Sequence, residues 1–364
     1  MHMTSWAAMN HEPAASQVNP SLSFLIPVYN VERYLDDCLN SLLPAVQPGD
    51  EIILVNDGSK DASGALCDTW QQKHPTIISV IHQPNQGLSV ARNRAFSAST
   101  KAYVYFLDSD DLLCHKDFTE ARNALKASNP DILTCDALIW HEGTPREAES
   151  RVVHSLPKGS IPSRETALLS TFRDNFLSSS SRIFKRSFLT RWAPDIFPPG
   201  QYYEDNATIP HLVAGADRMA YLPVPIFRYR IRQGSITRSH TVQRCIDLSS
   251  SFKGVLPSMV SSRQGQVVER AANVLALKHM VQAVRNASQI RPIKRDHIDM
   301  TITHGLNTLT LSPQELLNEL SKSREHRKLL GHARGMLLHR WRYVSVRIAM
   351  SRWKQLLETF RQDH

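Results

Sequence analysis

The chain has 364 residues, of which 41% are hydrophobic and 21% are charged, as in ordinary soluble globular proteins with one large domain or two smaller ones. It contains no run of about 18 apolar residues, which argues against a membrane-spanning helix. The formal net charge of +9 is concentrated at the C-terminus, because residues 321–364 carry eleven Lys or Arg and three Asp or Glu. Any attraction to an anionic partner therefore acts through this tail.

The N-terminus and the cysteines bear on the cellular compartment. Residues 1–20 lack a basic stretch followed by an apolar core, so we expect a flexible leader rather than a signal peptide. The five cysteines are Cys38, Cys67, Cys114, Cys135 and Cys245. Their odd number and the lack of a CxxC pair favour a reducing compartment and argue against structural zinc. We therefore expect a cytoplasmic protein.

Strand and helix patterns alternate along the first part of the chain. Apolar runs predict strands at 23–30, 51–59, 77–82 and 103–107. Helical spacing predicts helices at 32–43, at 63–74 with Ser63 as a candidate N-cap, and from Leu88 onward. This alternation predicts a mostly parallel sheet covered by helices.

The later chain predicts more mixed structure. Helices are expected at 118–127, 163–176 and 205–214, strands at 131–140 and 225–232, and a polar loop or hairpin at 142–162. From Thr241 the pattern becomes mainly helical. We therefore expect a leader (1–20), an α/β domain (21–240) with halves at 21–112 and 113–240, and a helical C-terminal region (241–364).

Three carboxylates follow the strand at 103–107. Asp108, Asp110 and Asp111, with Ser109 between them, lie where the strand ends, and ligands of open α/β sheets bind at that edge. Like charges packed together cost free energy unless a cation or polar ligand offsets them. Oxygen ligands suit Mg²⁺ or Mn²⁺, which commonly bridge protein carboxylates and substrate phosphates. The alternative is a cluster of helix N-cap residues.

Other motifs are missing from the sequence. It has neither GxGxxG nor GxxxxGK[ST], which removes the main support for hydride transfer and ATP hydrolysis. It also has no recognised nucleic-acid-binding motif. We therefore expect no nucleic-acid partner, although the basic tail keeps that alternative open.

Six segments, in order and at matching spacing, resemble the family 2 glycosyltransferases, which have the GT-A fold. They are SFLIPVYNVERYLDDCLNSLL, EIILVNDGSKD, QPNQGLSVARNRA, YVYFLDSDD, YYEDNATIPHLV and YRIRQGSITRS, within residues 21–239. The resemblance implies a Rossmann-like, mostly parallel central sheet with flanking helices. It also implies that residues 21–112 bind the nucleotide and 113–240 the acceptor.

The resemblance implies a nucleotide pocket after the first two predicted strands. Pro27, Tyr29, Asn30 and Glu32 would line it, and Asp57 would contact the base or ribose. A carboxylate can accept from a uracil N–H or ribose hydroxyls, and a tyrosine offers an aromatic face. The alternatives are a core aromatic for Tyr29 and a β-turn residue for Asp57.

Asn85, Gly87 and Arg92 match the third family motif and are expected at the nucleotide site. A glycine permits close approach of the backbone. An arginine can pair with a phosphate or an aspartate, so a purely structural salt bridge is the alternative for Arg92.

Asp108 and Asp110 match the family's DxD pair. The resemblance implies that Asp110 binds Mn²⁺ or Mg²⁺ directly, whereas Asp108 holds ribose or reaches the metal through water. Ser109 is expected beside the nucleotide, and Asp111 is expected to be structural. The metal would stabilise the charge that builds on the departing nucleoside diphosphate.

Glu204 and Asp205 match the family's ED motif, whose aspartate is the catalytic base that takes the proton of the acceptor hydroxyl. Glu204 is then a helix-start residue or an acceptor contact. Arg232 and Ser235 lie in a basic, hydroxyl-bearing segment that resembles a loop closing on the diphosphate. Many relatives carry a histidine in this stretch, where this chain has Gln233, so the phosphate contact stays open.

The tail predicts a basic amphipathic helix in which Leu337, Trp341, Val344 and Ile348 share one face. Such a helix suits an anionic membrane surface, here the inner face of the cell membrane. The alternative is a helix packed on the catalytic domain or on a partner subunit of a homo-oligomer.

The sequence thus predicts an inverting, metal-dependent glycosyltransferase. It would move a sugar from a nucleotide diphosphate donor, expected to be UDP-linked, to a hydroxyl of a cell-surface polysaccharide or lipid-linked glycan. The alternatives are a protein or small-molecule acceptor, and a non-catalytic nucleotide-sugar-binding protein.

Overall fold

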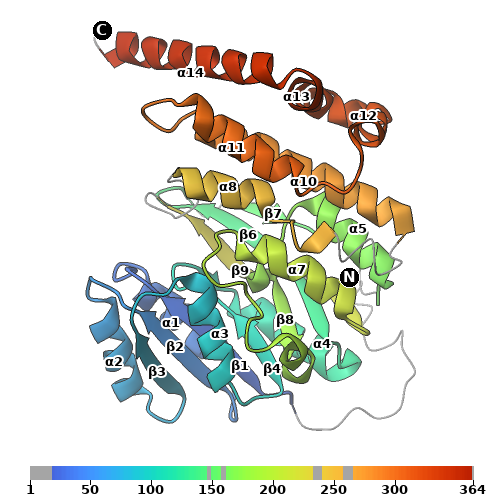
Figure 1. Ribbon diagram of the computed structural model, residues 1–364. Helices are drawn as coiled ribbons and strands as arrows, with labels where there is room; N and C mark the ends of the chain where they lie inside the picture. Colours follow the sequence, from blue (N-terminus) through green and yellow to red (C-terminus); the bar gives the residue numbers. More distant parts are fainter. Residues whose placement is uncertain (1–18, 146–148, 157–160, 233–239, 257–264, 363–364) are drawn as a thin grey trace. The chain divides into compact units, whose positions relative to one another are not determined.

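A computed structural model describes residues 19–145, 149–156, 161–232, 240–256 and 265–362 (Figure 1). The chain divides into two compact units, Met1–Arg232 and Gln233–His364. The predicted boundary at residue 240 borders residues 233–239, which lie outside the described ranges. Within those ranges, no helix is both long enough and apolar enough to cross a bilayer.

A mixed sheet forms the centre of the first unit. Its described strands run in the order β3-β2-β1-β4-β8-β6-β9-β5, and β7 pairs with β6. The strands are β1 (Leu22–Val28), β2 (Glu51–Asp57), β3 (Ile78–Gln83), β4 (Tyr103–Phe106), β5 (Leu112–Leu113), β6 (Ile132–His141), β7 (Ser150–Val152), β8 (Arg182–Lys185) and β9 (Met219–Ile231). The first four are mutually parallel, β8 is antiparallel to β4 and β6, and β9 is parallel to β6.

Helices flank this sheet (Figure 1). They are α1 (Leu35–Leu42), α2 (Ser63–Lys73), α3 (Leu88–Ala98), α4 (His115–Ser128), α5 (Arg164–Asp174), α6 (Arg186–Leu189) and α7 (Glu204–Gly215). Every residue of β1 is buried, which explains its nearly continuous apolar sequence LSFLIPV. The ring of Phe118 on α4 packs against Phe24 of β1 and Tyr105 of β4 at 5.5 and 5.2 Å between centroids. The predicted strand–helix alternation is therefore confirmed.

One predicted helix start and one predicted N-cap are wrong. The first helix begins at Leu35 rather than at residue 32, because Glu32 instead accepts a hydrogen bond from the Ala62 amide at 2.8 Å. The N-cap of α2 is Ala62 rather than Ser63. The Ser63 hydroxyl accepts instead from the Val31 amide at 2.8 Å, and it thereby joins the loops after β1 and β2.

The second unit is helical in its described part. Its helices are α8 (Val242–Ser250), α10 (Gly265–Ala287), α11 (Arg295–Leu306), α12 (Pro313–Ser321), α13 (Arg327–Leu338) and α14 (Arg340–Gln362). Its core comprises buried aliphatic and methionine side chains from α10 to α14, including Leu277, Ile302, Leu316, Met336 and Val344. This unit therefore has a hydrophobic core of its own.

The apolar face predicted for the tail splits in two. Val344 is fully buried in the core of the second unit, and Leu337 and Ile348 pack against it. Trp341 is exposed instead. Three of the four predicted residues therefore face protein, and a membrane contact through that face is wrong.

Candidate active site

The predicted nucleotide residues gather at the carboxyl edge of the parallel strands. Asp57 is the last residue of β2 and is buried. Its Oδ1 accepts from Gln83 Nε2 and the Gln86 amide, and its Oδ2 accepts from the Gly87 amide, each at 2.8 Å. Asp57 therefore fixes the loop between β3 and α3, which also carries Asn85.

Two glycines allow this loop to approach β2. Gly87 is the N-cap of α3 with φ 90°, a left-handed conformation that favours glycine. Gly58 has φ 68°, and a Cβ at Gly58 would lie 2.7 Å from the Asn85 amide nitrogen. The loop that begins α3 thus lies directly against the turn after β2.

The loop after β1 is tied to the loop after β2. Asn30 has φ 51°, and its Oδ1 accepts from the Lys60 amide at 2.8 Å. The Glu32 carboxylate likewise accepts from the Ala62 amide in the loop after β2. Pro27 is buried within β1. Tyr29 is 39% exposed, so the alternative of a core aromatic is wrong for this residue. Its ring remains accessible for stacking against a ligand.

Arg92 connects the DxD and ED segments. It is 1% exposed and donates through Nη2 to Asp108 Oδ1 at 2.7 Å. Through Nη1 it donates to Glu204 Oε1 at 2.6 Å and to Asp205 Oδ1 at 3.2 Å. Burial lowers the pKa of Arg92, but the three carboxylates outweigh this effect and raise it. The structural salt bridge expected as the alternative for Arg92 is therefore present, and direct phosphate contact stays a prediction.

Glu204 and Asp205 form the first turn of α7, after Tyr203 in the left-handed region with φ 61°. Burial, opposed by Arg92 and reinforced by Asp205, raises the pKa of Glu204 to about 7. Burial also raises the pKa of Asp205, whose Oδ2 accepts from the Ser179 amide at 3.2 Å. A carboxylate with a raised pKa takes a proton more readily near neutral pH, as a general base must.

The three acidic residues after β4 have different surroundings. Asp110 Oδ2 accepts from Arg232 Nε at 2.8 Å. Burial and the charge of Asp108 raise the pKa of Asp110, and Arg232 opposes this shift. Asp111 is buried and accepts from the Arg230 amide at 2.8 Å, which fits its predicted structural role. Ser109 is buried between them.

Asp108 and Asp110 fit a hard divalent cation. Both supply carboxylate oxygens, and their mutual repulsion is visible in the raised pKa of Asp110. Among the residues that the structure describes, no group of three or more His, Cys, Asp or Glu could hold a metal. A cation here would therefore take one or two protein carboxylates and complete its shell with substrate oxygens or water, as Mg²⁺ commonly does.

Several contributors could not be predicted from the sequence. The Tyr34 ring lies beneath Arg230 and Arg232, with guanidinium carbons 5.0 and 4.6 Å from its centroid. The Phe197 ring lies 5.1 Å from the guanidinium carbon of Arg92. In the sequence, Tyr34 is only one apolar residue of the helix predicted at 32–43. The Ser179 amide cannot be recognised from sequence at all, since every residue except proline carries a backbone N–H. The predicted Ser235 lies outside the described residues.

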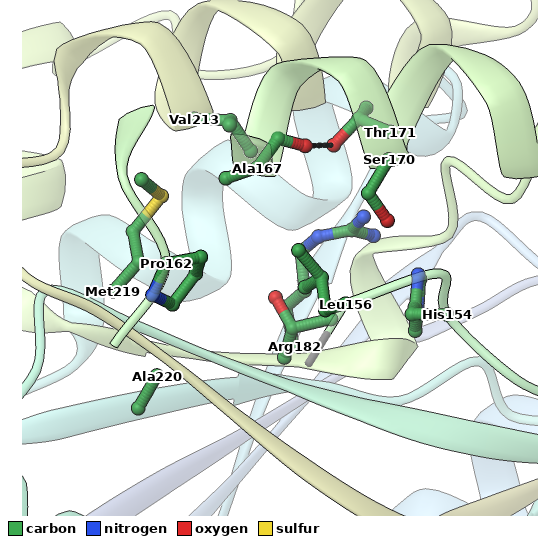
Figure 2. A pocket seen from close by; sticks show the side chains of 11 residues that line it. His154, Leu156, Pro162, Ala167, Ser170, Thr171, Arg182, Val213, Met219 and Ala220 are labelled. Atoms are coloured by element: carbon green, nitrogen blue, oxygen red, sulfur yellow. Dashed lines mark hydrogen bonds between the residues drawn. The ribbon is translucent and has the colours of Figure 1, made fainter. Parts of the chain in front are cut away.

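A separate small pocket lies between α5 and the sheet (Figure 2). It includes His154, Ser170, Thr171 and Arg182, and it shares no residue with the predicted site. Within the described structure, His154 Nε2 and Arg182 Nε are buried without a hydrogen-bond partner. Burial lowers the pKa of His154, so its ring is neutral at pH 7.

The sheet order, the strand-edge carboxylates and the ED helix start match the GT-A fold that the sequence resemblance implies, and the comparisons with known proteins agree. The family profile described as "Glycosyl transferase family 2" matches residues 23–192. This match confirms the predicted resemblance to the family, and the likeness to solved structures confirms the predicted fold.

Individual relatives are distant. The Bacillus subtilis protein named "Putative glycosyltransferase EpsH" is 28% identical over 61% of this chain and 64% of its own length, so the chain spans just under two thirds of it. S. aureus TarS 1–349, solved with UDP-GlcNAc, covers 94% of this chain and 92% of its own with 17% identity and a TM-score of 0.60. A mannosyltransferase from Pyrobaculum calidifontis, solved with GDP-Man and Mn²⁺, covers 96% and 92% with 16% identity and a TM-score of 0.51.

Proposed function

We propose that the protein is an inverting, metal-dependent glycosyltransferase that uses a nucleotide diphosphate sugar, most simply a UDP-sugar. The observation that carries this proposal is the Arg92 cluster. One buried guanidinium holds Asp108 of the DxD segment and Asp205 of the ED segment, so donor and acceptor chemistry meet at one place. A non-catalytic sugar-binding protein has no need for the second of these carboxylates.

In this proposal Asp205 acts as the general base. It accepts the proton of the acceptor hydroxyl while that oxygen bonds to the anomeric carbon and the carbon–oxygen bond to the diphosphate breaks. Direct displacement inverts the configuration at that carbon. Ser179 and Arg92 each hold one oxygen of Asp205, and this fixes the carboxylate in place.

The donor would lie along the carboxyl edge of β1 to β4. Tyr29 would stack on the base, and Asp57 would position the loop of Asn85 and Gly87 against the nucleotide. Asp110 and Asp108 would hold Mn²⁺ or Mg²⁺, which when bound supplies positive charge for the departing diphosphate. Arg232, beside Asp110, offers a forked donor for phosphate oxygens.

The acceptor proposed is a hydroxyl of a cell-surface polysaccharide or lipid-linked glycan, which follows from the family resemblance. A lipid-linked acceptor would place a cytoplasmic enzyme at the inner face of the cell membrane. Residues 321–364, with eleven basic and three acidic residues, are the proposed contact with that surface.

The test is a screen of the purified chain against a panel of nucleotide sugars, with Mn²⁺, with Mg²⁺ and with a chelator. We expect one or a few donors to be hydrolysed slowly without acceptor, and only with metal. Asp205→Asn serves as the matched control that keeps the donor site but lacks the base. Nucleotide-sugar binding without turnover of any donor or acceptor would favour the non-catalytic alternative.

A further inference from the structure

The outward face of α14 carries large apolar side chains in an exposed setting. Val346, Met350 and Trp353 are 54%, 58% and 66% exposed. Few soluble surfaces display this many large apolar residues on one helix, and contiguous exposed apolar area marks an interaction site. We call Val346, Met350 and Trp353 the outer stripe.

Helical geometry separates the outer stripe from the packed side of α14. Positions 346, 350 and 353 recur at i, i+4 and i+7 and therefore share a face. The other side packs within the second unit, where Val344 is buried and Ser351 Oγ donates to the Ser288 carbonyl at 2.6 Å. The outer stripe therefore lies on the side of α14 that does not pack within the second unit.

The charge around the outer stripe has one sign. Residues 326–357 include eight Lys or Arg and no Asp or Glu. Arg342, one turn before Val346, and Arg352, next to Trp353 in the sequence, are both exposed. Among the described residues, neither forms an ion pair, whereas Arg340, on the packed side, bonds to Asp299 at 2.8 Å. The surface therefore combines exposed apolar side chains with cations that the protein itself does not neutralise.

We propose that the outer stripe with Arg342 and Arg352 docks on an anionic lipid bilayer, with the apolar side chains inserted at the headgroup level. Tryptophan and arginine both suit that interface, since each joins an apolar body to a polar end. A second copy of the chain would bring two such basic surfaces together and repel. Nucleic acid would neutralise the arginines but would leave the outer stripe in water. The inference deepens the membrane contact of the proposed function and replaces its predicted face.

The experiment is flotation of the full chain with vesicles of phosphatidylcholine containing 30% phosphatidylglycerol, with pure phosphatidylcholine as the comparison. We expect binding to the anionic vesicles that weakens as salt is added. Met350→Glu and Trp353→Glu should each lower the partition coefficient about tenfold or more. Each removes an apolar side chain that the bilayer would bury, and each adds a negative charge that the anionic lipids repel. Arg342→Gln should lower it about fivefold.

Met300→Glu is the matched control, because Met300 is an exposed methionine on α11 of the same unit. It should bind vesicles like the wild type. Equal loss in Met300→Glu and Met350→Glu would overturn the proposal, as would an absence of vesicle binding. A dimer abolished by Met350→Glu would assign the stripe to a second copy, and retention on DNA abolished by Arg342→Gln would assign it to nucleic acid.

Donor hydrolysis in solution is measured for the same variants. It should be unchanged in all of them, because none of these residues lies among those placed at the active site. Loss of vesicle binding with intact hydrolysis supports the docking surface independently of the reaction. Vesicle binding in a chain that hydrolyses no donor would refute the proposed function and leave the docking surface standing.

Discussion

The cluster around Arg92 and the outward face of α14 differ in whether their charged side chains are paired within the protein. At the cluster, the buried guanidinium of Arg92 is hydrogen-bonded to three carboxylates, so these charges are paired within the protein. On α14, Arg342 and Arg352 are exposed, and no acidic residue lies between positions 326 and 357. Charges that the fold pairs internally set the geometry and proton affinity of a reactive site. Charges that the fold leaves unpaired select an external partner.

The largest expected effect tests the reactive side of this comparison. Asp205→Asn should lower the transfer rate by about 10²–10⁴-fold, because it removes the proposed general base. Metal-dependent binding of UDP, measured by calorimetry, should stay within about twofold, since the proposed role of Asp205 is toward the acceptor and not the donor. Asp110→Ala should nearly abolish both transfer and metal-dependent UDP binding. Wild-type turnover in either variant would contradict the site assignment.

Arg92→Met should destabilise the first unit by about 3–5 kcal/mol, because it leaves three carboxylates without their buried cation. The measurement is the urea dependence of unfolding, followed by hydrogen exchange in the first unit. Arg342→Met makes the same chemical change on α14, where the side chain is exposed. It should change the free energy of unfolding by less than about 0.5 kcal/mol. Similar losses in the two variants would erase the distinction between the two regions.

A smaller effect concerns pH. The pKa of Glu204 is raised to about 7, above its ordinary value of 4.5. Protonation of Glu204 therefore favours the folded state, and its stabilising contribution is full below pH 4.5 and lost as pH rises through 7. Glu204→Gln should remove this loss, which is about 3 kcal/mol. Melting temperatures measured from pH 5 to 8 should fall more steeply in the wild type, and parallel curves would disprove the raised pKa.

The smallest effect lies in the second unit. Ser312 and Glu315 form a capping box at the start of α12. Ser312→Ala should cost about 1 kcal/mol of stability in the second unit. Donor hydrolysis should be unaffected, because the cap is remote from the reactive residues in sequence and belongs to another unit. A parallel loss of hydrolysis would show that the two regions are coupled.

Local patterns in the sequence were sufficient for part of the molecule. Mostly apolar runs predicted β1, β2 and β4, and α3 begins at the predicted Leu88 because Gly87 takes its left-handed N-cap position. The carboxylates after β4 could be placed at the sheet edge because parallel strands end there. These features depend on neighbours within a few residues.

Other features depend on pairings that no local pattern carries. The sequence allowed Arg92 a phosphate or an aspartate, and only the fold shows carboxylates from positions 108, 204 and 205 around it. Likewise, the tail has apolar residues on both sides of one helix, and periodicity alone could not decide which side meets the core. The buried Val344 and the exposed Trp353 decide it.

The sequence separation between Arg92 and its partners limits which segments of this chain could be exchanged with those of a relative. Its partners lie 16, 112 and 113 positions away along the chain, so the segment from 113 to 232 is not an independent cassette. A chimaera that takes this segment from a relative would keep Arg92 and Asp108 but would receive new neighbours for their shared charge. Such an exchange would succeed only where the relative's α7 begins with the same two acidic residues, buried to the same degree and within hydrogen-bond distance of Arg92. Acceptor specificity is therefore easier to alter by substitution around the ED turn than by grafting a whole half.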